Sequence, residues 1–130
     1  MECVSKALPA LWRSEKVQAK AARVGYDWTD REMAFRKLPE ELQEIREAMD
    51  AGDPDAMEEE LGDLLFAAVK LARFLNIDPE AALHRSCEKF IRRFAAVEQA
   101  ASAAGKALEE LSLDELLPIY DAVKAAEHQA

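Results

Sequence analysis

The sequence predicts an all-α protein: one domain over residues 1–130, folded as an antiparallel bundle of about five helices. Valine, isoleucine and threonine, which favour strands, supply only 11 of the 130 residues, whereas alanine, the strongest helix former, is abundant. Three of the four glycines, Gly25, Gly52 and Gly105, lie where helices are expected to end. A chain of this length suffices for one domain with a modest core.

The first helix is expected over residues 8–24 and the second within residues 30–51. For the second helix, Thr29 is the expected N-cap and Glu32 reaches back to complete a capping box. Pro39 falls inside this segment. Because proline removes one helical hydrogen bond, we expect a kink or a restart of the helix there.

The remaining three helices are expected over residues 53–75, 78–104 and 112–126. Asp53 and Asp78 each precede a proline, which is the pattern of an N-cap followed by proline at the first helical position. Ser112 with Glu115 three residues later indicates a second capping box. Pro118 predicts another kink or restart.

An apolar stripe at helical spacing runs along the third helix, and we expect it to pack in the core. Its members are Leu61, Leu64, Leu65, Ala68, Leu71, Ala72 and Leu75.

The acidic character of the chain is local. The formal net charge is −9, yet residues 40–63 alone contain eleven acidic residues and one arginine, so the rest is about neutral. A nucleic-acid-binding groove is not expected, because such sites need a basic stripe.

No apolar run reaches the length of about 20 residues that a membrane span needs. No secretory signal is visible at residues 1–9, and two cysteines cannot form a disulfide scaffold, so a reducing cytoplasmic location is expected.

Two pairs of acids within this block are spaced to share a helix face: Glu41 with Glu44, and Glu60 with Asp63. The turn around Gly52 should make the two helices antiparallel, so that the pairs face each other. Four converging carboxylates repel one another and favour a hard cation, Mg²⁺ or Mn²⁺. The same spacing is common on solvated helix faces, and both interpretations stay open at this point.

The second half of the chain carries the complementary charge. Lys89 and Arg93 lie four residues apart on one helix face, and Lys124 lies on the last helix. Cations beside a carboxylate-bound metal would suit a polyphosphate. The alternative is that they are ordinary surface charges.

Four segments, residues 8–11, 21–28, 59–66 and 89–94, resemble the MazG nucleoside triphosphate pyrophosphohydrolases in order and spacing. The resemblance covers nearly the whole chain and is closest to the C-terminal catalytic half of the two-domain bacterial proteins. It implies the all-α pyrophosphohydrolase fold and Mg²⁺-dependent cleavage of an NTP or dNTP to the monophosphate and pyrophosphate. It also implies a housecleaning role in the nucleotide pool and a homodimer or larger homo-oligomer, for which the alanine-rich face at residues 95–103 provides close helix contacts.

The resemblance also implies roles for individual residues. The metal ligands would be Glu41, Glu44, Glu60 and Asp63, with Mg²⁺ as the ion and Mn²⁺ as its substitute. The residues that act on the phosphates would be Lys89, Arg93 and Lys124. The substrate-binding residues would be Tyr120, Gln18 and Trp28; for Trp28, packing in the core or in a dimer is an equally good interpretation.

Two other classes of function remain open. One is a non-catalytic regulatory protein of the same fold that binds a nucleotide or a metal. The other is a helical interaction protein whose acids form a solvated face. If the protein is an enzyme, a further alternative is that it acts on another, related nucleotide substrate.

Overall fold

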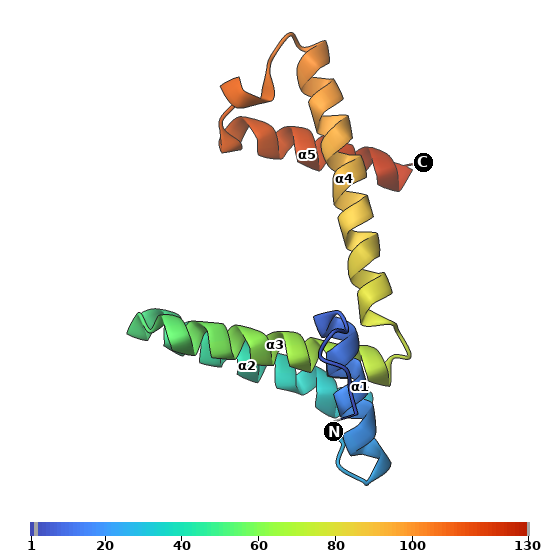
Figure 1. The fold of residues 1–130 in the computed structure, drawn as a ribbon. Coiled ribbons are helices and arrows are strands. Elements are labelled where there is room, and N and C mark those ends of the chain that lie inside the picture. Colours follow the sequence, from blue (N-terminus) through green and yellow to red (C-terminus); the bar gives the residue numbers. More distant parts are fainter. Residues whose placement is uncertain (2, 130) are drawn as a thin grey trace. The chain divides into compact units, whose positions relative to one another are not determined.

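The computed structural model describes residue 1 and residues 3–129, and it confirms an all-α fold with five α-helices (Figure 1). Over these residues no strand is present. A short 3₁₀ helix, η1, which the sequence pattern did not indicate, precedes the last α-helix. The elements are α1 (Ala10–Arg23), α2 (Arg31–Ala51), α3 (Pro54–Phe74), α4 (Pro79–Ala103), η1 (Leu108–Glu110) and α5 (Leu113–Gln129).

The chain divides into two compact units, Met1–Ala82 (unit 1) and Leu83–Ala130 (unit 2). Unit 1 holds α1, α2, α3 and the first turn of α4. Unit 2 holds the rest of α4, η1 and α5. That residues 1–130 act as one domain stays a prediction.

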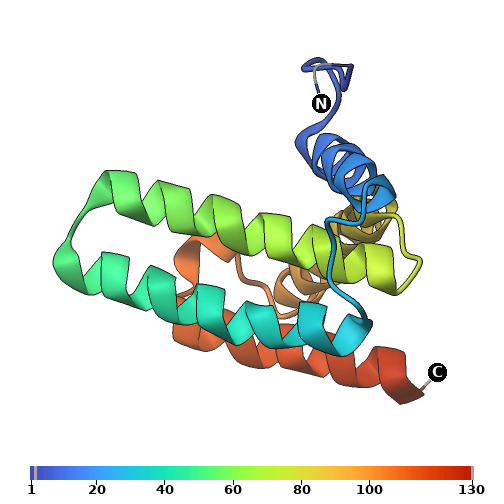
Figure 2. The same ribbon diagram turned by 90° about the horizontal axis from the view of Figure 1, so that it is seen from below.

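In unit 1, α2 and α3 form an antiparallel pair of helices that lie side by side (Figure 2). The connection is short because Gly52 adopts the left-handed conformation, with φ of 63°, which glycine accepts without strain. Ala34 and Ala48 of α2 and Ala67 of α3 are buried, and their small side chains let the helix backbones approach closely. The antiparallel arrangement predicted for these two helices is confirmed.

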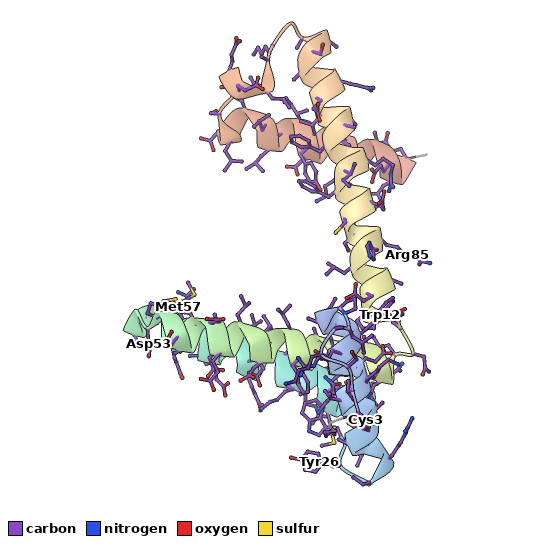
Figure 3. All side chains as sticks on the ribbon, in the orientation of Figure 1. Cys3, Trp12, Tyr26, Asp53, Met57 and Arg85 are labelled. Carbon is purple, nitrogen blue, oxygen red and sulfur yellow. The ribbon has the colours of Figure 1, made fainter. Side chains whose placement is uncertain are left out.

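Two side chains of α1 bond to the rest of unit 1. The Gln18 amide nitrogen donates to the backbone carbonyl of Phe66 in α3 at 2.9 Å. The Trp12 indole N–H donates to the Asp78 carboxylate at 2.8 Å, beside the start of α4 (Figure 3). These contacts fix α1 to the second half of α3 and to the start of α4.

Three of the predicted helix starts are confirmed by their hydrogen bonds. Asp53 and Asp78 each accept bonds from the backbone N–H groups two and three residues later. Ser112 and Glu115 form both halves of a capping box, at 3.3 Å and 3.2 Å.

The predicted start of α2 was wrong by one residue. Asp30, not Thr29, is the N-cap, and its carboxylate accepts the N–H of Met33 at 3.0 Å. A carboxylate is the stronger partner for the partial positive charge at a helix N-terminus. The Thr29 hydroxyl instead contacts the sulfur of Met33.

A kink or a restart was predicted at each internal proline; the restart was wrong, and a kink stays a prediction. α2 continues through Pro39 and α5 continues through Pro118 without interruption. Each proline removes only one backbone hydrogen bond, and the bonds of the neighbouring turns maintain the helix.

The apolar stripe of α3 is only partly buried, which corrects the expectation that it packs in the core. Three members are half-buried and four are exposed; the half-buried ones are Leu64, Leu71 and Ala72. Leu61 is 51% exposed and Leu65 is 52% exposed. The side of α3 that meets α2 instead carries Glu60 and the buried Ala67. Periodicity identified an apolar face but could not identify what covers it.

In unit 2, aromatic side chains join α4 to α5. Phe90 stacks on Phe94 with ring centroids 5.9 Å apart, and Phe90 lies 6.5 Å from the ring of Tyr120. Val97 and Ala101 are buried.

Among the described residues, none of the helices is sufficiently long and apolar to span a membrane. Cys3 and Cys87 are free thiols. The cytoplasmic location stays a prediction.

Candidate functional site

Three of the four predicted metal ligands come together in unit 1. Glu41 of α2 and Glu60 and Asp63 of α3 each place one carboxylate oxygen within 4.8 Å of the others. The antiparallel pairing brings them together, because residues three apart in α3 share a face and that face lies against α2.

Glu44, the fourth predicted ligand, lies one turn after Glu41 and is exposed. Its carboxyl group interacts with the carboxyls of both Glu60 and Glu41. The hydrogen bond shared with Glu60 raises the pKa of Glu44, and lost solvation and repulsion from Glu60 act in the same direction. Glu44 is therefore an outer member of the same group, which we call the carboxylate cluster: Glu41, Glu44, Glu60 and Asp63.

Burial of Glu41 makes ionisation of the carboxylate cluster costly. Glu41 is only 6% exposed, and this burial, with repulsion from Glu44, raises its pKa above the ordinary range. One oxygen of Glu41 and one of Glu60 are buried with no hydrogen-bond partner. Buried carboxylate oxygens without donors fit the coordination of a hard divalent cation such as Mg²⁺ or Mn²⁺.

Lys37 is a cation of α2 that the sequence analysis missed. Its ammonium lies 3.2 Å from Glu40 and 3.5 Å from Glu41. The spacing of four residues to Glu41 could have identified it, because it places both side chains on one helix face. One lysine does not balance four acids.

A second lysine, Lys70, lies near Trp28. Its ammonium is 4.3 Å from the centroid of the Trp28 ring. Lys70 lies seven residues after Asp63, two helical turns along the same face, so periodicity could have indicated it. The contact with Trp28 could not have been found that way, because the two residues are far apart in the sequence.

Gln18, predicted to bind substrate, has both polar atoms of its side chain engaged. It donates to Phe66, as described above, and accepts from Arg73 at 3.3 Å. Arg73 also forms a mostly buried ion pair with Asp27, at 2.6 Å. Burial opposes ionisation of Asp27, but hydrogen bonds from Arg73 and from the backbone of Trp28 hold its pKa below the ordinary value. Substrate binding by Gln18 and Trp28 stays a prediction; the geometry adds that they are connected through Arg73 and Asp27.

The predicted phosphate-binding residues all lie in unit 2. The Arg93 guanidinium donates to Glu127 at 2.9 Å, and its contacts with Tyr120 and Glu127 raise its pKa. The Lys124 ammonium lies 5.7 Å from the centroid of the Tyr120 ring, and Lys89 is exposed. Their action on a substrate stays a prediction.

Comparison with known proteins gives a family match over the region that holds the carboxylate cluster. The model for "MazG nucleotide pyrophosphohydrolase domain" matches residues 30–97, just over half of the chain. These residues include all four acids, Lys89 and Arg93.

Two curated relatives align with nearly the whole chain. It is 41% identical over 124 residues to the nucleoside triphosphate pyrophosphohydrolase/pyrophosphatase MazG of Thermotoga maritima, covering 95% of this chain and 48% of the relative. It is 40% identical over 129 residues to the nucleoside triphosphate pyrophosphohydrolase of Escherichia coli K12, covering 98% of this chain and 49% of the relative. The chain thus spans about half the length of these relatives.

Proposed function

The chain belongs to the MazG nucleotide pyrophosphohydrolase family, and on that premise we propose that it hydrolyses nucleoside triphosphates to the monophosphate and pyrophosphate. Both relatives are named for this activity. The observation that carries the proposal is the carboxylate cluster with its two buried, unpartnered oxygens. Removal of aberrant NTPs or dNTPs from the nucleotide pool is the corresponding biological role.

We propose the carboxylate cluster as the site of Mg²⁺, with Mn²⁺ as a substitute. When bound, the ion would neutralise charge on the triphosphate. In the reaction, a water oxygen bonds to the α-phosphorus, the bond from that phosphorus to the bridging oxygen breaks, and pyrophosphate leaves. A glutamate of the cluster accepts the proton of the water. Lys89, Arg93 and Lys124 bind the phosphates and stabilise the departing charge, while Tyr120 contacts the nucleoside.

Mg²⁺ should raise the melting temperature of the protein. Because the pKa values of Glu41 and Glu44 are raised in the folded state, their ionised forms lower stability at neutral pH. At about one hundred times its Kd, the ion should add about 2.7 kcal/mol to the free energy of unfolding. Thermal melting with and without Mg²⁺ measures this, with EDTA as the reversal.

The melting temperature should also change with pH in a defined direction. Without metal, the contribution of these two groups to stability should rise as the pH falls from about 7 toward the ordinary glutamate pKa of about 4.3, because protons relieve the repulsion. The effect of Mg²⁺ should shrink over the same range, since protons compete for the ligands. An interaction protein with a solvated acidic face would instead melt at the same temperature with and without Mg²⁺.

The reaction itself is tested with a panel of NTPs and dNTPs in the presence of Mg²⁺. We expect one pyrophosphate for each monophosphate formed, and the panel gives the base and sugar preference. Nucleotide binding without release would indicate the regulatory alternative. Release of orthophosphate with a diphosphate would contradict cleavage at the α-phosphorus.

We further propose that the chain assembles as a homodimer through an exposed apolar face of the α2–α3 pair. We call its members the apolar face: Phe35, Leu42, Met49, Leu61, Leu65 and Leu75. Heptad spacing relates the three residues of α2, and helical spacing relates the three along α3 and its C-cap. All six are at least 41% exposed.

Helix geometry places the two halves of the apolar face on one side of the α2–α3 pair. Leu42 directly follows the buried Glu41, and Leu61 directly follows Glu60, so each is rotated by about 100° from the helix contact. In antiparallel helices these rotations lead to the same side. Phe35 and Leu75 line one small cavity, which supports the placement. A second copy would present an identical face, as two-fold interfaces require.

A further inference from the structure

A small cavity of about 150 Å³ in unit 1 adjoins the carboxylate cluster. Glu41 and Asp63 line one part of it, and Lys37, Lys70, Trp28 and Phe66 line the rest. A group bound in this cavity would therefore contact acids of the cluster and ammonium groups at the same time.

The Lys70 side chain faces aromatic rings rather than acids. Its ammonium is 4.3 Å from the Trp28 ring centroid and 5.8 Å from that of Phe66. Among the described residues, no carboxylate lies within ion-pair distance of it. Burial lowers the pKa of Lys70, and the nearby Arg73 adds to this effect, although Asp27 opposes it. Lys70 is thus a half-buried cation whose charge aromatic faces balance only in part.

Lys37 differs, because Glu40 and Glu41 already pair with its ammonium. Of the two lysines that line the cavity, Lys70 is the one with a charge still to be matched. An anionic group entering the cavity would match it.

The protein holds the segment with Trp28, against whose ring the Lys70 ammonium lies, in place before any ligand arrives. Asp27, next to Trp28, pairs with Arg73 of α3, and Arg73 in turn bonds to Gln18 of α1. This network fixes the segment after α1 against α3. A pre-positioned cation loses less conformational freedom when it binds an anion.

We propose that Lys70 binds a phosphate oxygen of the substrate in this cavity, with Trp28 holding the ammonium toward the carboxylate cluster. The proposal rests on the function proposed above. A phosphate fits because it carries charge for both sides: it can bridge a divalent cation on the acids and the ammonium of Lys70. A nucleobase would offer the ammonium of Lys70 neutral acceptors and no negative charge.

The test measures binding of inorganic pyrophosphate, which has no base or sugar, by calorimetry in the presence of Mg²⁺. Lys70→Met keeps the aliphatic stem against Trp28 and removes the charge, and it should weaken pyrophosphate binding at least about tenfold. Lys70→Arg should retain most of the affinity. Lys16→Met, an exposed lysine of α1, makes the same change in net charge and should bind as the wild type does.

The increase in melting temperature with Mg²⁺ should persist in Lys70→Met, which shows that the metal site and the fold are intact. Wild-type affinity for pyrophosphate in this variant would overturn the proposal. If the order of preference among bases also changed in that case, Lys70 would contact the base instead of a phosphate. If wild-type protein cleaves no nucleotide while Lys70→Met still weakens pyrophosphate binding, the proposed function fails and the role of Lys70 stands.

Discussion

Replacing Asp63 with asparagine should lower the rate of pyrophosphate release at least about a thousandfold. The substitution keeps the size of the side chain and removes one of the carboxylates that lie within 4.8 Å of one another. Losing a charged ligand weakens the metal and the electrostatic stabilisation that depends on it. The measurement is kcat in the substrate assay, together with the increase in melting temperature caused by Mg²⁺, which should become small.

Two further variants make this result specific. Glu60→Gln should behave like Asp63→Asn, because Glu60 also contributes one of the unpartnered buried oxygens. Glu58→Gln removes an exposed acid of the same helix and should leave both the rate and the Mg²⁺ effect unchanged. Helicity by circular dichroism should be the same in all three variants. Full activity in both Asp63→Asn and Glu60→Gln would refute the assignment of the site.

Replacing Leu42 with glutamate should convert the proposed dimer to a monomer. Leu42 is 56% exposed in the chain, so the change should leave the fold of unit 1 intact. In a two-fold dimer each substitution occurs twice, and each copy loses an apolar contact and places an unpaired charge in the interface. The dimer Kd should therefore rise at least about a hundredfold, since each buried leucine contributes about 1.5–3 kcal/mol. Sedimentation at micromolar concentration measures the result.

The matched control is Gln43→Glu, which adds the same charge one residue further along α2, away from the apolar face. It should sediment as the wild type does. If Leu42→Glu remains as dimeric as Gln43→Glu, the apolar face is not the dimer interface. A wild-type chain that is monomeric at these concentrations would contradict the dimer itself.

The helices could be predicted because their signals are local. Asp53, Asp78 and Ser112 cap helices through atoms two or three residues away, and such contacts depend only on the neighbouring sequence. The prediction for Thr29 was wrong because the adjacent Asp30 competes for the same role, and the sequence pattern does not rank the two. The restarts expected at Pro39 and Pro118 did not occur, since one missing bond does not outweigh the turns on either side.

The pairing of the acids could also be predicted, but their environments could not. The spacing of Glu41 with Glu44, and of Glu60 with Asp63, places each pair on one helix face. Which member is buried depends on how the two helices are rotated against each other. That rotation buries Glu41 and exposes Glu44, a difference invisible in the spacing.

The sequence by itself thus determined the class of fold, the helices, and the acidic block of residues 40–63 as the place of the candidate site. Tertiary structure decided which carboxylate oxygens lack partners, which apolar residues remain uncovered, and that Lys70 lies against Trp28. The physical reason is the range of the interactions. Caps and helix faces arise from neighbours within about one turn, whereas burial and the contact of Trp28 with Lys70 require distant segments to pack together.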